Sequence, residues 1–209
     1  MSARPARYGW FVVAALFALV VYVSLNTLRS HHVASEGLKA GTKVPPFAAP
    51  LALGSVDGDV NVARKPNQGA AGHRPACSVR GPGILNSCQL AEQGPFVVAF
   101  VATRGARCTR ELDRLQRLSA RHPGVQVAAV SIRGGRGDLR DLIKRHGWRF
   151  PVAWDRDGVL ANLYGVAVCP LMSYVLPGGT VQSTSVGELD DARLDRRLTA
   201  LEDAARTVR

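Results

Sequence analysis

Uninterrupted apolar runs alternate with segments of helical periodicity in the second half of the chain. Residues 96–102 (FVVAFVA) and 125–132 (VQVAAVSI) are almost wholly apolar, as expected of strands that are buried on both faces. Between them, residues 110–122 carry a leucine at every third position and are followed by a Pro-Gly pair. This pattern predicts a helix that connects two buried strands.

The same alternation continues to the C-terminus. Asp138 stands where an N-cap is expected for a helix that ends at Gly147, and a Pro-Gly-Gly turn at 177–179 predicts a β-hairpin. The remaining expected elements are short and bounded by turn residues: a strand over 151–154, a helix over 158–164, strands over 172–176 and 180–186, and a helix over 188–205. This order predicts an α/β fold whose central sheet is mixed and is covered by helices on both faces.

The region before the first buried strand is less regular. Residues 46–63 alternate weakly and predict a short pair of strands that turns at Asp57-Gly58. Residues 64–95 form a Gly/Pro-rich insertion. A long irregular segment inside a compact domain is usually functional or pinned in place.

An uncharged apolar segment runs from Trp10 to Leu28 near the N-terminus. About 20 such residues cross a bilayer core, so the segment predicts a transmembrane anchor. Arg4 and Arg7 precede it, which places the N-terminus in the cytoplasm. The alternative is a signal peptide cleaved after Val33-Ala34-Ser35. Both interpretations export the rest of the chain.

The expected organisation follows from these boundaries. A cytoplasmic N-terminus (residues 1–9) precedes the anchor (10–28), a polar linker (29–45) and one folded domain (46–209). We therefore expect a single-pass cell-membrane protein whose C-terminal domain is extracytoplasmic.

The chain is strongly basic, with a formal net charge of +11 over 209 residues. The arginines are scattered, however, and aromatic residues make up only 6% of the chain. Nucleic-acid sites usually combine clustered basic residues with aromatic ones, so the pattern favours a solvated basic surface and no nucleic-acid partner.

Four cysteines are present, and export would favour their pairing as disulfides. Cys77 and Cys88 lie in the insertion, where a disulfide closing that short loop would stabilise the fold by about 3 kcal/mol. Too few other ligands lie near these cysteines, or near Asp155 and Asp157, to predict a metal site. No metal or cofactor is expected.

Cys108 follows the first buried strand within VATRGARCTREL and stands at the start of the next helix. The unpaired N–H groups of a helix start and the nearby arginines 104, 107 and 110 would lower the pKa of a thiol there. The alternative is that Cys108 is buried on the inner side of the helix and inert.

These features resemble the thioredoxin-like superfamily, in particular its membrane-anchored TlpA-like and peroxiredoxin-like (AhpC/TSA, redoxin) branches. Four motifs carry the resemblance: FVVAFVATRGARCTREL, the run HGWRFPVAWDRDGVLANLYGV at 146–166, the pair Cys169-Pro170 where the family has a cis-proline, and the hairpin VLPGGTV. They cover roughly residues 42–203 and imply a thioredoxin-like fold.

The site departs from the family pattern. Gly105 stands where the family has its attacking cysteine, Arg104 replaces the usual tryptophan, and Ala99 replaces a frequent buried proton acceptor. The resemblance places the residue before the cis-proline against the active-site loop. Our hypothesis is therefore that Cys108 and Cys169 form a redox pair in place of the missing CxxC pair, with Cα atoms roughly 4.4–6.8 Å apart. The alternatives are a permanent structural disulfide between them, or a Cys169 that is only a small buried hydrophobic residue.

Three functions remain open at this point. The first is thiol–disulfide exchange with protein thiols or disulfides, with Pro170, Arg104, Arg107 and Thr103 expected to contact the substrate. The second is a thiol peroxidase, in which peroxide oxidises Cys108 and Cys169 resolves it. The peroxiredoxin threonine and proline are replaced by Gly105 and Val101 in this chain. The third is a non-catalytic binding or assembly module.

Overall fold

The computed structural model describes residues 6–30, 36–56, 58 and 74–208. The chain divides into two compact units, residues 1–34 and 35–209. The first contains the helix α1 (Ala6–Ser30), whose described apolar side chains are exposed. Over the part of the chain that the structure describes, no helix has the length and apolarity required to span a membrane. The alternative cleavage site at Val33-Ala34-Ser35 lies outside the described residues.

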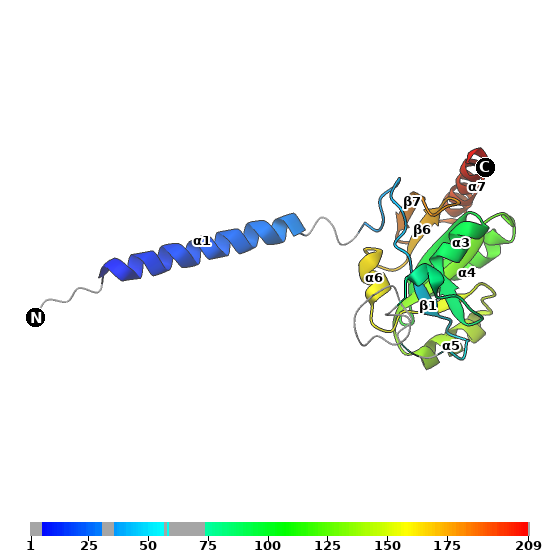
Figure 1. The fold of residues 1–209 in the computed structure, drawn as a ribbon, viewed down its shortest axis with the longest axis horizontal. Coiled ribbons are helices and arrows are strands. Elements are labelled where there is room, and N and C mark those ends of the chain that lie inside the picture. Colours follow the sequence, from blue (N-terminus) through cyan, green and yellow to red (C-terminus); the bar gives the residue numbers. More distant parts are fainter. Residues whose placement is uncertain (1–5, 31–35, 57, 59–73, 209) are drawn as a thin grey trace, which may run out of the picture. The chain divides into compact units, whose positions relative to one another are not determined.

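The second unit is built on a five-stranded sheet of order β5-β4-β3-β6-β7 (Figure 1). Strands β3 (Phe96–Ala102), β4 (Gln126–Arg133) and β5 (Val152–Trp154) are parallel to one another. Strands β6 (Leu171–Val175) and β7 (Val181–Val186) complete the sheet in antiparallel fashion. The predicted mixed α/β sheet is confirmed.

Helices cover both faces of this sheet, because each side of the buried strands is apolar. Helices α4 (Ala106–Ser119), α5 (Arg136–His146) and α7 (Asp191–Thr207) share one core with the odd-numbered residues of β3. Helices α3 (Ser87–Gln93) and α6 (Val159–Leu163) share the other core with its even-numbered residues. The alternation of β3 therefore fixes which helices lie on which face.

Two helix starts differ from the sequence prediction. Helix α4 begins at Ala106 rather than Arg110, so Cys108 lies inside its first turn. The predicted N-cap at Asp138 is wrong: Gly135 is the N-cap of α5, and Asp138 lies in the first turn. No side chain caps this helix start. The predicted end is right, since Gly147 has the left-handed φ of 63° that a terminating glycine permits.

The first strand has a different partner from the one expected. Strand β1 (Ala48–Pro50) pairs antiparallel with β2 (Ile84–Asn86), which lies within the insertion after the short 3₁₀ helix η1 (Ala76–Ser78). Asp57 of the expected turn, and residues 59–63 beyond it, lie outside the described residues. The pairing with β2 shows that β1 closes the base of the insertion.

Part of the expected linker is packed on the domain. The backbone of Gly41 and Thr42 exchanges hydrogen bonds with Val181 at 2.8 Å, and the N–H of Val44 donates to Gly179 at 2.9 Å. These bonds use backbone groups only, so the polar side chains of this stretch gave no sign of them.

His122 joins the end of helix α4 to helix α7. Its two ring nitrogens lie 3.0 Å from a carboxylate oxygen of Glu202 and 3.1 Å from one of Asp195, and the imidazole is buried. Burial lowers the pKa of His122, but the hydrogen bonds and charges of Glu202 and Asp195 outweigh it, so the net shift is upward. The protonated ring therefore holds the two helices together.

We predict that replacing His122 by glutamine removes a pH dependence of stability. A raised folded pKa gives stability that is complete below the unfolded value of about 6.5 and is lost as the pH rises through the folded value. Urea unfolding of the wild type should therefore show a decline over that interval, and His122→Gln should be flat there. Parallel curves for the two proteins would contradict this.

Candidate active site

The sheet topology brings two distant cysteines to one edge. Strands β3 and β6 are antiparallel neighbours, with Phe100 opposite Leu171, so the end of β3 meets the start of β6. Cys108 follows β3 in the first turn of α4, and Cys169 lies two residues before β6. Although they are 61 positions apart in sequence, their Cα atoms are 5.6 Å apart, and the structure joins them as a disulfide.

The two sulfur atoms have different surroundings. Cys108 is 5% exposed and packs in the core under α4, with no acidic residue in the first turn of that helix. Cys169 is half-buried, and its Sγ lies 3.4 Å from the carbonyl oxygen of Phe100. Cys169 is therefore the more accessible sulfur of the pair.

The peptide bond between Cys169 and Pro170 is cis, at the position where the family resemblance expects it. Pro170 is buried, and its carbonyl oxygen accepts a hydrogen bond of 2.8 Å from the N–H of Gly187. Val168, on the other side of Cys169, is 45% exposed. The accessible sulfur is thus flanked by an exposed apolar side chain.

The other predicted substrate contacts lie on the loop before α4 and in its first turn. Arg104 and Arg107 are exposed, and neither has an ion pair within the described residues. Thr103 is half-buried, and its N–H donates to the carbonyl of Arg133 at 3.1 Å.

Gly105 is the N-cap of α4 and lies next to the Cys108 sulfur. A Cβ added at Gly105 would lie 3.3 Å from the Sγ of Cys108. The position that carries an attacking cysteine in the family therefore still points at Cys108 in this chain.

Glu111 is a buried charge near the site that the sequence did not single out as functional. It is fully buried one turn after Cys108, where it is paired with Arg114 and accepts a hydrogen bond of 3.2 Å from the N–H of Leu189. Burial raises the pKa of Glu111, against the opposing effects of the Leu189 N–H and Arg114. Because the carboxylate is engaged by these groups, it ties α4 to the segment before α7.

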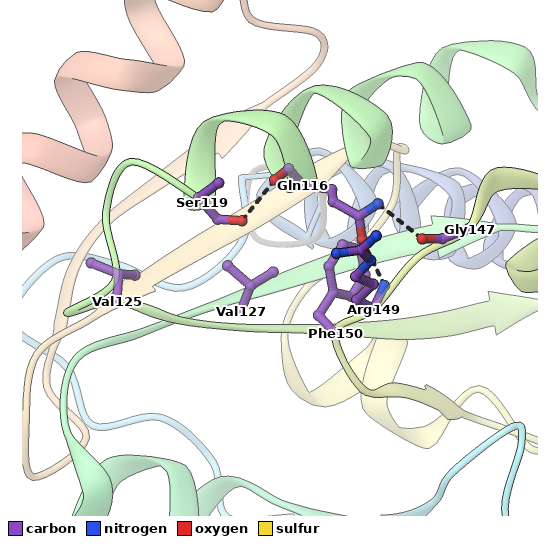
Figure 2. Close-up of a pocket in the computed structure, with 8 residues that line it drawn as sticks. Gln116, Ser119, Val125, Val127, Gly147, Arg149 and Phe150 are labelled. Atoms are coloured by element: carbon purple, nitrogen blue, oxygen red, sulfur yellow. Dashed lines mark hydrogen bonds between the residues drawn. The ribbon is translucent and has the colours of Figure 1, made fainter.

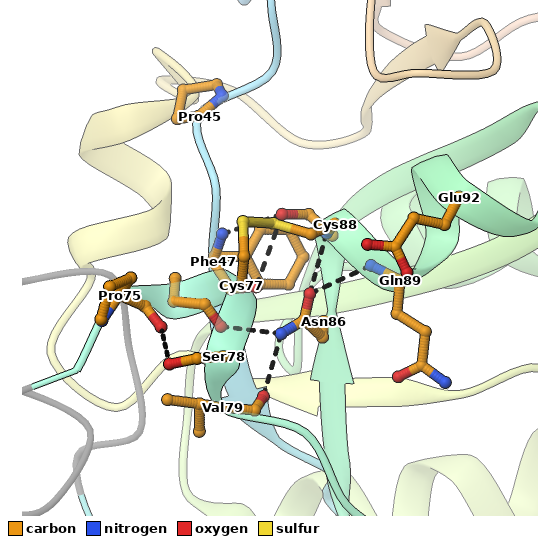
Figure 3. The surroundings of a disulfide bond; sticks show 12 residues. Pro45, Phe47, Pro75, Cys77, Ser78, Val79, Asn86, Cys88, Gln89 and Glu92 are labelled. Carbon is orange, nitrogen blue, oxygen red and sulfur yellow. Dashed lines mark hydrogen bonds between the residues drawn. A yellow bond between two sulfur atoms is a disulfide. The ribbon is translucent and has the colours of Figure 1, made fainter.

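The second disulfide, Cys77–Cys88, lies at the base of the insertion, with Cα atoms 5.3 Å apart (Figure 3). The buried side chain of Asn86 reinforces it by donating to the carbonyls of Ala76 and Val79 at 2.8 and 2.9 Å. The same side chain accepts hydrogen bonds from the N–H groups of Cys88 and Gln89. The disulfide and the asparagine together fix η1 to the start of α3.

A cavity of about 450 Å³ lies elsewhere on the domain, between the end of α4 and the segment after α5 (Figure 2). Gln116 spans it, donating to the carbonyl of Gly147 at 3.0 Å and accepting from the N–H of Arg149 at 2.6 Å. No cysteine lines this cavity, so we do not assign the thiol chemistry to it.

Comparison with known proteins agrees with this geometry. Residues 83–184 match the AhpC/TSA family. The thiol-disulfide oxidoreductase ResA of Oceanobacillus iheyensis is 30% identical over 98 residues, which cover 46% of this chain and 51% of that protein. The chain thus matches about half the length of this curated relative.

Two solved structures show the same fold. A protein of Chlorobium tepidum described as a thiol:disulfide interchange protein DsbE has a TM-score of 0.60 at 22% identity, covering 78% of this chain and 98% of its own. The peroxidoxin BcpB of Mycobacterium tuberculosis has a TM-score of 0.59 at 17% identity, covering 79% and 97%. The chain therefore has a thioredoxin-like fold, and its residues 83–184 match the AhpC/TSA (redoxin) family.

We predict that the Cys77–Cys88 disulfide stabilises the fold without taking part in exchange. Replacing both cysteines by alanine should lower the free energy of unfolding by about 3 kcal/mol, because the unfolded chain regains the freedom of the closed loop. Urea unfolding measures this, and the rate of disulfide exchange, measured well below the unfolding midpoint, should not change. A lost exchange rate in a folded double variant would contradict the structural role.

Proposed function

We propose that the domain is a thiol–disulfide oxidoreductase that uses Cys108 and Cys169 in place of a CxxC pair. The observation that carries the proposal is the placement of these two sulfurs within bonding reach beside a cis-proline. The similarity to ResA supports the same chemistry. Protein thiols or disulfides are the proposed substrates, contacted by Pro170, Thr103, Arg104 and Arg107.

Cys169 is the sulfur that exchanges with the partner in this proposal. A partner thiolate attacks the Sγ of Cys169, the bond between the two protein sulfurs breaks, and its electron pair stays on Cys108. Access favours attack at Cys169, which is half-buried whereas Cys108 is 5% exposed. Leaving as a thiolate is easier for Cys108, because it lies in the first turn of α4, where backbone N–H groups favour an anion.

A second partner thiolate then attacks the partner's own sulfur in the mixed disulfide and releases Cys169. The partner loses two electrons and becomes a disulfide, and the domain gains them as two thiols. Once Cys169 carries a proton, its thiol can donate to the Phe100 carbonyl 3.4 Å away, which favours its neutral form. The sequence is reversible, and the relative reduction potentials of the two pairs set its direction.

The AhpC/TSA match favours a thiol peroxidase as the second candidate. There, the Cys108 thiolate would break the O–O bond of peroxide, become a sulfenic acid and release water or alcohol; Cys169 would then condense with it and release water. Local geometry supports this candidate less well. Gly105 and Val101 offer no side-chain donor, and the Thr109 hydroxyl donates to the carbonyl of Ala106 at 3.2 Å.

We also propose that the uncharged segment from Trp10 to Leu28 tethers the domain to the outer side of the cell membrane. The support is the length of this segment and the two arginines that precede it. Carbonate extraction of membranes tests the tether: the full chain should remain in the pellet, and release into the supernatant would contradict it.

Single cysteine variants test the order of attack. In Cys108→Ser, the free Cys169 should form a stable mixed disulfide with a peptide disulfide, because the sulfur that would displace the peptide is missing. In Cys169→Ser, the buried Cys108 should react at least tenfold more slowly, on the general ground that thiol reactivity follows access. Intact-mass spectrometry after timed quenching measures both rates.

The variants also separate the three candidate functions. Reduction of a peptide disulfide by the wild type that both substitutions abolish supports exchange. Peroxide consumption that depends on Cys108, without disulfide reduction, would show that the domain is a thiol peroxidase instead. Turnover of neither substrate would leave a binding module.

A restored CxxC pair gives an independent check. Gly105→Cys in the Cys169→Ser background places a sulfur next to Cys108, since a Cβ at position 105 lies 3.3 Å from its Sγ. We predict that this double variant recovers exchange to within about tenfold of the wild type, an estimate that assumes ordinary access at the helix start. Gly105→Ser/Cys169→Ser is the matched control and should stay inactive.

A further inference from the structure

A second cavity, of about 410 Å³, lies at the carboxyl ends of β3 and β4. Its lining residues come from the end of β4, the loops that follow β3 and β4, and the first turn of α5: Thr103, Arg104, Arg133, Gly134, Gly135 and Asp138. Parallel strands place their ligands at this end of a sheet. The volume is within the range of cavities that hold small ligands or a few residues of a peptide.

Close packing of the two loops forms the wall of this cavity. The carbonyl of Arg133 accepts a hydrogen bond of 3.1 Å from the N–H of Thr103, and Gly134 has a φ of +109°. A Cβ at Gly134 would lie 1.8 Å from the Oγ1 of Thr103, so only glycine allows the loops to approach this closely. The arrangement holds Arg104 and Arg133 along one cavity.

The lining of the cavity carries more positive than negative charge. Arg104 and Arg133 are exposed and have no ion pair within the described residues, whereas nearby Arg110 is paired with Glu188 at 3.0 Å. Asp138 is the one acidic side chain in the lining, so two cations face a single carboxylate. The cavity therefore favours an anion that can approach the arginines away from Asp138.

The lining of this cavity and the loop that leads to Cys108 belong to one segment of the chain. Arg104 directly precedes Gly105, whose added Cβ would lie 3.3 Å from the Cys108 sulfur. A peptide whose cysteine reaches Cys169 would therefore have neighbouring residues close to Arg104 and Arg133. Guanidinium groups recognise carboxylates through paired hydrogen bonds.

We propose that this cavity binds acidic side chains that flank the cysteine of a partner protein. The role of this cavity in selecting substrates rests on the proposed exchange function, whereas its binding of acidic side chains does not. Arg104 and Arg133 attract the acidic segment, and Asp138 limits how tightly it is held.

Binding can be measured without any thiol reaction. The oxidised wild-type chain is titrated, by calorimetry at low salt, with a peptide that carries serine in place of its cysteine and two flanking aspartates. The comparison peptide has asparagines in place of the aspartates. We expect the acidic peptide to bind about tenfold more tightly and to lose this advantage at high salt, since salt screens exposed charges.

Variants assign the effect to this cavity. Arg104→Gln and Arg133→Gln should each weaken binding of the acidic peptide about three- to tenfold, and Asp138→Asn should strengthen it by a similar factor. Arg149→Gln removes an exposed arginine from the other cavity and should change nothing. The opposite sign at Asp138 distinguishes recognition of charge from a general loss of structure.

Equal affinity for the acidic and amide peptides would overturn the proposal, as would equal losses in Arg149→Gln and Arg104→Gln. Glutathione tests whether the carboxylate that binds belongs to a small molecule. If glutathione binds more tightly than the acidic peptide, the proposal that the ligand is a partner protein is overturned. If the acidic peptide binds as expected but its cysteine form shows no exchange, the proposed oxidoreductase function fails while the binding site stands.

Discussion

The antiparallel contact between β3 and β6 is the constraint on which the site depends. Because the end of one strand meets the start of the other, the loop after β3 and the cis-proline before β6 lie together at one edge of the sheet. Both strands are buried on both faces, so their register is fixed by two apolar cores. The two cysteines inherit their proximity from this register rather than from any contact between their own loops.

A pair built from two separate loops differs physically from a CxxC pair. In a CxxC motif, one helix start holds both sulfurs, whereas here the helix start holds only Cys108 and the cis-proline segment holds Cys169. The buried sulfur lies where an anion is favoured, and the accessible sulfur lies beside a carbonyl oxygen that can accept a hydrogen bond from its thiol. These different surroundings are the reason that the proposed exchange begins with attack at Cys169.

The charges around the site are divided in a similar way. Arginines on the outer faces of α4 and α7 are mostly paired with carboxylates, such as Arg114 with Asp191 at 2.7 Å. Arg104, Arg107 and Arg133 at the reactive edge have no such pair within the described part of the chain. Part of the positive charge of the chain therefore gathers, unpaired, on the segments that follow β3 and β4, which composition alone did not reveal.

The sequence predicted the elements whose signal is periodic: the buried run at 96–102, the leucine spacing of α4 and the hairpin after Pro177. The sequence prediction failed where backbone hydrogen bonds, rather than side-chain patterns, determine the structure. The pairing of β1 with β2 and the bonds of Gly41 and Thr42 to β7 leave no side-chain pattern. Asp138 resembled a cap because the glycine that holds this place, Gly135, offers no side-chain signal. The cavity at Arg104 and Arg133 required the register of β3 against β4, which no local pattern encodes.

A redox titration of the thioredoxin-like domain tests the central claim most directly. The domain is equilibrated with dithiol buffers of stepped potential, quenched with an alkylating agent, and each cysteine is assigned by peptide mass spectrometry. The account predicts that Cys108 and Cys169 become alkylated together in one reversible two-electron step, while Cys77 and Cys88 stay bonded to more reducing potentials. Alkylation of Cys77 and Cys88 first, or a native bond joining Cys108 to any cysteine other than Cys169, would contradict it.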